Sequence, residues 1–346
     1  MKDFIKLNKL SKGDQVAVIS PSNGLPEIFP WVQDLGYERL ENVFGLKVKE
    51  YPTTRKMGSS LEDRARDIMA AFADPANKAV FASIGGDDQI KLLKYLDPAV
   101  FKSNTKPFFG SSDNTHLVNY LWNLGIPAYY GGVIMTQFAM QVDMHELTVD
   151  FLKHALFDEG EFEVKASPKY NDEGLDWADK ENLDKPRKME ENNGFIWDGS
   201  EDVEGVLWGG CVESMIVQCS TGKYLPSDEE VEGAVLYLET AEDIPEHWII
   251  QYLLTGFGER GWFDKFQAVL IGRPKAWEFD QQNSTEMKAE YRKNQRETVI
   301  NTIREYNKDI PIVQNLDFGH TDPQAVMPSG GKVRVLGSTK QIFLSY

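Results

Sequence analysis

A serine followed by an acid lies at a point where the sequence changes from an apolar run to a helical pattern. The apolar pair 108–109 leads through Gly110 into two serines and an aspartate. This order predicts a strand, a tight turn and a helix, the layout of the nucleophile elbow of hydrolases. Ser112 would project above the sheet edge as a nucleophile, and the N–H of Asp113 would be free to donate to an oxyanion. Asn114 replaces the usual second glycine, and a simple helix-capping role for Ser112 or Asp113 is the alternative.

A serine nucleophile needs a base, and among the five histidines the surroundings of His320 favour this role most. His320 follows Gly319 and precedes Thr321, which predicts a tight loop directly after a strand. Loops on rigid scaffolds carry a disproportionate share of catalytic side chains. The alternative is a loop histidine that bonds only to the backbone. The other histidines lie in or beside helical patterns, where packing or surface roles are expected: His116, His145, His154 and His247.

A histidine base needs a carboxylate that fixes its tautomer and stabilises the imidazolium. Glu239 closes the apolar run 234–238, so it would be partly desolvated and directed at the sheet edge. The alternative is an exposed acid at the start of the next turn, because glutamate is rarely buried without a partner. Gly85 and Gly86 follow another apolar run, 79–84, and their N–H groups could complete an oxyanion hole. Any strand-to-helix turn uses such a pair, so this signal is weak on its own.

The elements that must position these residues alternate between strand and helix in the first half of the chain. Apolar runs at 15–20, 79–84 and 108–109 predict buried strands, and the apolar residues of 90–96 predict one of the intervening helices. This alternation predicts a doubly wound parallel sheet that binds ligands beyond the carboxyl ends of its strands. From 170 to 199 polar residues dominate and the hydrophobic periodicity of helices and strands is absent, which predicts a long interdomain loop.

The second half resumes with further strands, at 205–208, 234–238 and 268–271. A helix capped by Asp243 and a long charged helix over 286–306 are also predicted. The remaining apolar segments indicate strands of a smaller mixed sheet or barrel. A length of 346 residues, together with the polar segment 170–199 between the two halves, predicts two domains.

Composition excludes several classes of protein. A formal net charge of −17 argues against non-specific binding to nucleic acid or to an anionic membrane. Cys211 and Cys219 form neither a disulfide framework nor a zinc-finger spacing. The absence of G-x-G-x-x-G argues against a nucleotide-dependent oxidoreductase. With no signal-peptide pattern and no apolar run of ~18 residues, we expect a cytoplasmic protein without a membrane span.

Taken together, several stretches resemble the successive blocks of the LD-carboxypeptidase family of serine peptidases. The similarity is greatest to its microcin C immunity branch, which has a longer loop. The blocks lie in order at 83–97, 108–121, 205–215, 235–246 and 317–335. The resemblance implies a Ser112–Glu239–His320 triad and an oxyanion hole from the backbone amides of Gly86 and Asp113. Neither a metal nor a cofactor is expected from it.

The resemblance also implies a fold and a substrate site. It implies an N-terminal flavodoxin-like domain with helices on both faces of a parallel sheet, and a C-terminal β-rich domain of swivelling or barrel-like form. We expect these domains at 1–168 and 201–346, joined by the loop 169–200, with the site between them and usually a homodimer. Trp177, Arg187 and Gly85 are expected to bind substrate, Trp177 by stacking on a planar group. The alternative is that Trp177 only anchors a long loop.

The implied activity is hydrolysis of an amide bond in a small peptide or an aminoacyl-nucleotide-like substrate. Murein tetrapeptide LD-carboxypeptidase activity is the nearest alternative, and a non-catalytic small-molecule binding protein is the alternative from another class. Asp87, Asp88 and Cys211 depart from the residues that the family more often carries. The two aspartates would disfavour a free carboxylate on the substrate if they lie at the mouth of the site. These departures affect specificity and leave the triad in place.

Overall fold

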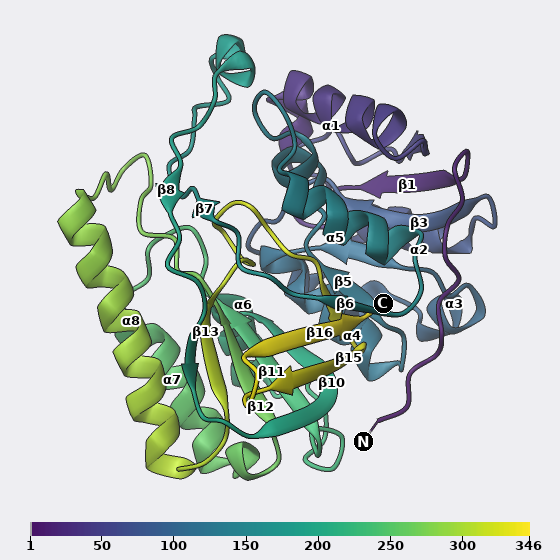
Figure 1. Ribbon diagram of the computed structural model, residues 1–346. Coiled ribbons are helices and arrows are strands. Elements are labelled where there is room, and N and C mark those ends of the chain that lie inside the picture. The colour runs from purple at the N-terminus through teal and green to yellow at the C-terminus, as the bar shows by residue number, and fades with distance from the viewer. Residues whose placement is uncertain (1) are drawn as a thin grey trace.

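The first sheet is built from the strands of the N-terminal half plus one strand from the C-terminal half (Figure 1). The structure is a computed structural model and describes residues 2–346. The strands are β1 (Gln15–Ile19), β2 (Lys47–Glu50), β3 (Asn77–Ala82), β4 (Phe108–Gly110), β5 (Ala128–Tyr130) and β14 (Met327–Ser329). The helices are α1 (Pro30–Asn42), α2 (Leu61–Ala73), α3 (Pro98–Ser103), α4 (Thr115–Asn123) and α5 (Glu146–Leu156). The order β2-β1-β3-β4-β5, all parallel, is the flavodoxin-like order, which confirms the predicted fold of this half.

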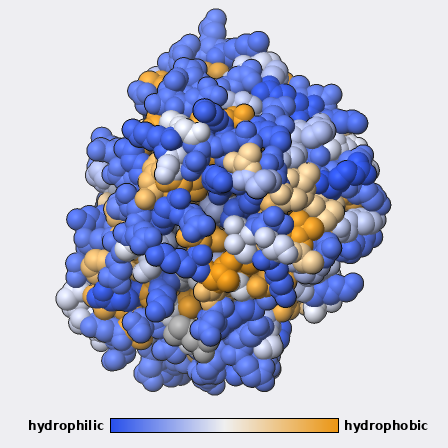
Figure 2. Space-filling view, turned by 90° about the vertical axis from the view of Figure 1, so that its right-hand side faces the viewer, coloured by the Kyte–Doolittle hydropathy of each residue, from blue (hydrophilic) through white to orange (hydrophobic). Residues whose placement is uncertain are grey.

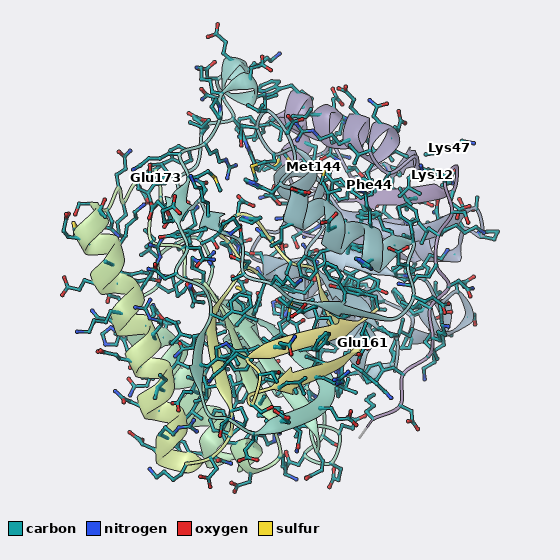
Figure 3. The ribbon with its side chains drawn as sticks, in the orientation of Figure 1. Lys12, Phe44, Lys47, Met144, Glu161 and Glu173 are labelled. Carbon is teal, nitrogen blue, oxygen red and sulfur yellow. The ribbon has the colours of Figure 1, made fainter. Side chains whose placement is uncertain are left out.

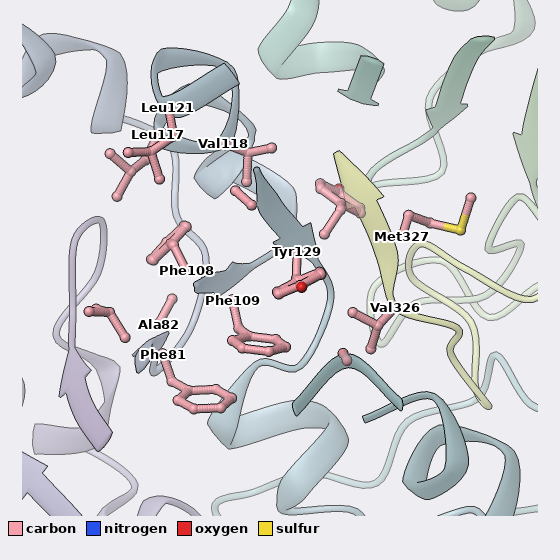
Figure 4. Close-up of a cluster of buried hydrophobic side chains, with 14 of the residues drawn as sticks. Phe81, Ala82, Phe108, Phe109, Leu117, Val118, Leu121, Tyr129, Val326 and Met327 are labelled. Atoms are coloured by element: carbon pink, nitrogen blue, oxygen red, sulfur yellow. The ribbon is translucent and has the colours of Figure 1, made fainter. Parts of the chain in front are cut away.

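The core of this half explains why its strands have continuous apolar runs. Helices lie on both sides of the sheet, so both faces of a central strand are buried. Phe81 of β3 stacks on Phe109 of β4 with ring centroids 4.5 Å apart, and Tyr129 of β5 follows at 4.8 Å from Phe109. Leu117 and Leu121 of α4 are also buried in this cluster (Figure 4). The end of β4 is therefore held on a rigid base.

The second sheet has eight strands in the order β6-β16-β15-β10-β11-β12-β13-β9. They are β6 (Glu161–Glu163), β9 (Ile196–Asp198), β10 (Asp202–Cys211), β11 (Ala234–Glu239), β12 (Ala268–Gly272), β13 (Ile312–Leu316), β15 (Lys332–Leu336) and β16 (Gln341–Ser345). The expected β-rich C-terminal domain is confirmed, but the expectation that its sheet is the smaller one is wrong. The short strands β6 and β9 add to its size and make it the larger of the two sheets. The paired strands form a row, with β6 at one edge and β9 at the other. Three helices cover one of its faces: α6 (Val212–Thr221), α7 (His247–Glu259) and α8 (Thr285–Tyr306).

The two sheets exchange strands. β14 follows β13 along the chain, yet it pairs antiparallel with β5 of the first sheet. In return, β6 pairs with β16 of the second sheet. Both pairings cross the domain bounds expected from the sequence, at 168 and 200. The chain between β13 and β14 thus passes from one sheet to the other, and this crossing carries His320.

The segment 170–199 contains more structure than a plain loop. β7 (Lys169–Tyr170) and β8 (Glu190–Glu191) pair as a two-stranded ribbon, and a 3-10 turn at Lys180–Asp184 lies beyond it, at the top of Figure 1. Backbone pairing orders this segment where no hydrophobic period exists. Its last part, β9, pairs with β13, so that part belongs to the second sheet.

Two predicted helices differ from the structure. The segment 90–96 forms two 3-10 turns, Gln89–Lys91 and Leu93–Tyr95, because Gln89 is tied to the serine turn by its backbone and side chain. The helix expected from Asp243 begins only at His247. Ile244 has a φ of +50°, which no right-handed helix accommodates, so residues 240–246 form an irregular loop.

The molecular surface agrees with the charged composition. The face shown in Figure 2 is mainly hydrophilic, with apolar side chains gathered near its middle. Within residues 2–346, no helix combines the length and the apolar character that a bilayer crossing requires.

Candidate active site

Ser112 occupies a strained turn at the end of β4. Its φ is +59°, a left-handed conformation that costs an L-residue ~1–2 kcal/mol. Nucleophile elbows hold their serine in such a strained strand-to-helix turn. Ser111 precedes the 3-10 turn and Asn114 precedes α4, and neither makes a capping bond through its side chain. The structure therefore gives no capping role to Ser112 or Asp113, and Ser112 lines a cavity.

Buried polar side chains hold this turn from below. Asn114, fully buried, donates to the carbonyl of Ser111 at 2.9 Å and accepts from the side chain of Gln89 at 2.8 Å. The N–H of Gln89 donates to the Asp113 carboxylate at 2.9 Å, and burial raises the pKa of Asp113. Nε2 of His116 lies 3.4 Å from Asp113, and burial lowers the pKa of His116 to about 4. His116 is therefore neutral near pH 7 and supports the turn from its buried side.

The Gly85–Gly86 turn lies directly against the serine. A Cβ placed on Gly85 would be 2.9 Å from the Cβ of Ser112 and 3.6 Å from the backbone nitrogen of Asp113. Only a glycine allows this approach. Both glycines line the same cavity as Ser112. The structure thus brings the predicted oxyanion-hole segments, which are far apart in the sequence, to one place.

Glu239 is the last residue of β11, and strand alternation directs its side chain toward the first sheet. Val235 and Tyr237 share that face and belong to the core around the first sheet, whereas Leu236 and Leu238 pack beneath the second-sheet helices. The Glu239 side chain is only 1% exposed, so the alternative of an exposed acid is wrong. A buried carboxylate requires partners.

Glu239 has two side-chain partners, one of which the sequence did not predict. Its Oε2 lies 2.7 Å from Nδ1 of His320, and its Oε1 accepts a hydrogen bond from the hydroxyl of Tyr130. The same Tyr130 oxygen accepts the backbone N–H of Ser112 at 2.8 Å. Burial and the charge of Glu239 raise the pKa of Tyr130 well above its ordinary value, so its hydroxyl stays protonated. Tyr130 therefore links the serine turn to the carboxylate.

A buried ion pair positions the loop that carries His320. Arg273, at the end of β12, bonds Asp317 at 2.7 Å, and each side chain is 1% exposed. The guanidinium also reaches the hydroxyl of Thr321 at 3.4 Å. Gly319 has a φ of +103°, and a Cβ there would lie 2.6 Å from Oε2 of Glu239. Glycine at 319 thus lets the loop backbone pass close enough for His320 to meet the carboxylate.

The second ring nitrogen of His320 also contacts a carboxylate. Nε2 lies 2.8 Å from Oε2 of Glu242, a residue of the irregular loop 240–246 that the sequence reasoning missed. Burial alone would lower the pKa of His320, but the charges of Glu239 and Glu242 and the bonds to them raise it well above its ordinary value. The charge of His320 in turn lowers the pKa of Glu242 to about 2. Each ring nitrogen of His320 thus faces a carboxylate, an arrangement that favours the imidazolium.

These residues share a cavity of about 600 Å³, a size typical of small-molecule sites. The lining combines Ser112 after β4 of the first sheet, Glu242 after β11 of the second sheet, and His320 from the connection between β13 and β14. Asp87 also lines it, as the sequence suggested. Asp88 instead bonds Arg64 at 2.8 and 2.9 Å and is not part of the lining.

The segment 170–199 contributes several residues to one side of the cavity, among them Trp177 and Arg187, two of the three residues predicted to bind substrate. Trp177 lines the cavity, packs edge-on against Phe29 with ring centroids 5.8 Å apart, and is partly buried. Trp177 therefore anchors the segment and also forms part of the cavity wall. Arg187 also lines the cavity and is held by Asp322 at 2.8 Å and by Gln141 at 2.6 Å. Cys211 is buried outside the lining, its Sγ 3.1 Å from Glu213.

One group of acids near the cavity has the spacing of a cation site. Asp172, Glu173 and Glu190 present oxygens close to one another. The ammonium of Lys288 bonds all three, at 3.0 Å from Asp172 and 2.9 Å from Glu173, and Glu173 is labelled in Figure 3 near the start of α8. The lysine therefore supplies the positive charge that these carboxylates need, and the group is an ion-pair network that ties the segment 170–199 to α8.

The Tyr130 hydroxyl provides a first test of the site. Tyr130→Phe removes the acceptor of the Ser112 N–H and one donor to Glu239, while the buried ring is retained. We expect kcat to fall by about 10- to 100-fold, because each lost bond leaves a buried polar group unpaired. Steady-state kinetics with the substrates given below would measure this effect. Tyr129→Phe, a neighbouring tyrosine that makes neither bond, is the matched control, and an equal loss in both variants would argue against the role of Tyr130.

Comparison with known proteins shows which sequences are related to this chain. A model of the LD-carboxypeptidase N-terminal domain matches residues 16–131, and a model of the LD-carboxypeptidase C-terminal domain matches residues 204–335. A Bacillus subtilis protein named "Putative carboxypeptidase YocD" is 27% identical over 342 residues, which cover 97% of this chain and 98% of that protein. The microcin C7 self-immunity protein MccF of Escherichia coli is 25% identical over 289 residues, or 83% of this chain and 79% of that protein.

A solved structure shows the same fold. The crystal structure of an MccF-like protein from Streptococcus pneumoniae, in complex with AMP, has a TM-score of 0.83 and 27% sequence identity to this chain. The match covers 96% of this chain and 99% of that one. The similarity therefore includes both sheets and the segment between them. The expected homodimer stays a prediction.

Proposed function

Because the chain belongs to the LD-carboxypeptidase family and is a carboxypeptidase-type hydrolase, we propose that Ser112, His320 and Glu239 act as nucleophile, base and orienting acid. The observation that carries the proposal is the bond of 2.7 Å between the buried Glu239 and Nδ1 of His320, a residue that lines the same cavity as the strained Ser112. Glu239 fixes the tautomer in which Nε2 is able to accept a proton.

The proposed reaction has two halves. The Ser112 hydroxyl attacks the substrate carbonyl and gives its proton to Nε2 of His320, while the N–H groups of Gly86 and Asp113 stabilise the oxyanion. His320 then delivers the proton to the leaving nitrogen, and the amide C–N bond breaks. Water attacks the acyl-enzyme with His320 as base again, which releases the acid and restores Ser112.

We propose an aminoacyl-nucleotide-like substrate rather than a murein peptide. The relatives named above supply part of the support, one being a microcin C7 self-immunity protein and another a structure with AMP. The chain itself supplies Trp177, which presents an aromatic surface to the cavity, and an arginine, Arg187, at the same wall. Aromatic rings bind nucleobases by stacking.

The two substrate classes are separated by a direct comparison. Purified protein is incubated with an aminoacyl sulfamoyl adenosine and, separately, with a murein tetrapeptide, and the products are followed by mass spectrometry. Release of the free amino acid and sulfamoyl adenosine at the higher kcat/KM is expected. Faster release of the terminal D-alanine would instead support the murein alternative. Saturable binding with no product from either would support a non-catalytic binding protein.

The Trp177 ring is expected to contribute to nucleotide binding. Trp177→Ala should raise KM for the aminoacyl sulfamoyl adenosine by about 5- to 150-fold, the equivalent of one stacked base. Trp177→Phe keeps an aromatic ring against Phe29 and should retain most of the affinity. Hydrolysis of a simple aminoacyl amide without the nucleoside is the control. If Trp177→Ala slows hydrolysis of both substrates equally, the ring acts only as an anchor of the segment.

A further inference from the structure

Nε2 of His320 is not free in the structure. The proposed reaction requires this nitrogen to accept the proton of Ser112, yet its partner is the carboxylate of Glu242 at 2.8 Å. Nδ1 cannot replace it, because Nδ1 bonds Glu239. Glu242 must therefore leave Nε2 before Ser112 can be activated.

Glu242 is placed so that it can move, unlike Glu239. Its side chain is 47% exposed, against 1% for Glu239. It belongs to the irregular loop 240–246 and lines the cavity, so a bound ligand can reach it. A carboxylate that leaves an imidazolium needs another cation or water as its partner.

The other positive charges of the cavity wall are already paired. Lys275 bonds Glu278, and Arg187 bonds Asp322. Asp243 lies beside Glu242, and burial, together with the negative charge of Glu242, raises the pKa of Asp243. The wall around His320 therefore combines Glu242 and Asp243 with cations that have their own partners. A positively charged group on the ligand would satisfy Glu242 once it releases the histidine.

We propose that Glu242 is a specificity-determining residue. Its carboxylate releases His320 and binds a primary ammonium group of the substrate instead. The proposal rests on the function proposed above and deepens it. Binding of a substrate with a free amino group near the scissile bond frees Nε2, whereas a substrate without one leaves the base occupied. Glu242 thus couples recognition of an unblocked aminoacyl group to activation of the nucleophile.

A pair of substrates tests the exchange. Alanyl sulfamoyl adenosine and its N-acetyl derivative differ only in the ammonium group. For the wild type, kcat/KM should be about 10- to 100-fold higher for the free-amino substrate, the usual effect of a charge-assisted hydrogen bond. Glu242→Gln should bring this ratio close to one, because it weakens binding of the ammonium and also frees His320 for the acetylated substrate. An unchanged ratio in Glu242→Gln would overturn the proposal.

Glu246→Gln is the matched control, since it makes the same chemical change on the same loop. Glu246 is exposed, makes no side-chain capping bond and does not line the cavity. It should retain the wild-type ratio. Loss of the ratio in both variants would overturn the proposal, because a general disturbance of the loop would then explain it.

A pH readout excludes a merely structural role for Glu242. The charged groups that act on His320 are Glu239 from β11 and Glu242 and Asp243 from the loop, and the charge of Lys275 acts in turn on Glu242. Because Glu242 stabilises the imidazolium, Glu242→Gln should shift the acidic limb of kcat/KM for the acetylated substrate to lower pH. A limb that stays at the wild-type pH would contradict the assignment.

Titration by NMR keeps the test independent of turnover. In Ser112→Ala, the pKa of His320 should fall when alanyl sulfamoyl adenosine binds and stay the same with the N-acetyl derivative. Equal pKa values with both ligands would overturn the exchange even if the wild type is an active hydrolase. Conversely, a wild type that hydrolyses neither substrate would refute the proposed function, and the titration would still report whether Glu242 exchanges partners.

Discussion

Ser112→Ala is expected to reduce kcat by about 10⁴- to 10⁶-fold, the order of loss that follows removal of a member of a catalytic triad. The fold should be unaffected, because alanine meets the same left-handed φ as serine and the turn is held by Asn114 and Gln89. Residual activity would come from the oxyanion hole and from binding. Single-turnover and steady-state hydrolysis of the aminoacyl sulfamoyl adenosine would measure the loss, and circular dichroism would verify the fold.

The neighbouring serine supplies the control for this variant. Ser111→Ala removes a hydroxyl one residue away, on the extended residue before the strained turn, and should retain measurable turnover. A fluorophosphonate should label the wild type at Ser112 and leave Ser112→Ala unlabelled. Turnover by Ser112→Ala at the wild-type rate would exclude Ser112 as the nucleophile, and a wild type that resists labelling would favour the binding-protein alternative.

Local patterns were sufficient to predict the parts of the site that depend on single elements. The apolar run before Gly110 and the helical pattern after it predicted the serine turn. The run 234–238 predicted a strand, and period-two alternation then determines which face of that strand Glu239 occupies. Each of these inferences needs only neighbours in sequence, because a strand or a helix end is specified locally.

Contacts between distant elements could not be predicted in the same way. From the sequence alone, Tyr130 is expected to be only a core residue of a strand. The pairing of β5 beside β4 is what brings its hydroxyl within hydrogen-bond distance of the Ser112 N–H. In the sequence, Glu242 is one of several acids before a helix. It contacts His320 only because the β13–β14 connection crosses between the sheets. Three-residue edge strands such as β6 carry too little pattern to be recognised, so the second sheet was underestimated.

The crossing strand also explains why the three proposed catalytic side chains converge. Ser112 follows a strand of the first sheet and Glu239 ends a strand of the second, and neither sheet alone provides the histidine. The connection from β13 to β14 is anchored at one end by the Arg273–Asp317 pair and at the other by pairing of β14 with β5. His320 is therefore fixed relative to both sheets at once, which limits relative movement of the two halves at the site.

Glu239→Gln is expected to lower kcat by about 10³- to 10⁴-fold, because an amide presents the wrong hydrogen-bonding partner to the imidazole. Oε1 accepts from Tyr130 and Oε2 bonds Nδ1 of His320, so the carboxylate acts as an acceptor on both sides. Glutamine has only one acceptor oxygen. If its NH₂ group faces Nδ1, the proton of the neutral imidazole moves to Nε2, which then cannot accept the proton of Ser112.

Glu242→Gln makes the same chemical change at the opposite nitrogen of the same ring, and this pair of variants separates the two roles. Glu239→Gln should depress hydrolysis of both alanyl sulfamoyl adenosine and its N-acetyl derivative at every pH. Glu242→Gln should change their ratio while an active base remains. Both substitutions should lower the pKa of His320, since both carboxylates raise it, so a pKa measurement alone cannot distinguish them and the rates decide. A Glu239→Gln enzyme near the wild-type rate, together with an inactive Glu242→Gln enzyme, would assign the orienting role to Glu242 and reverse the proposed chemistry.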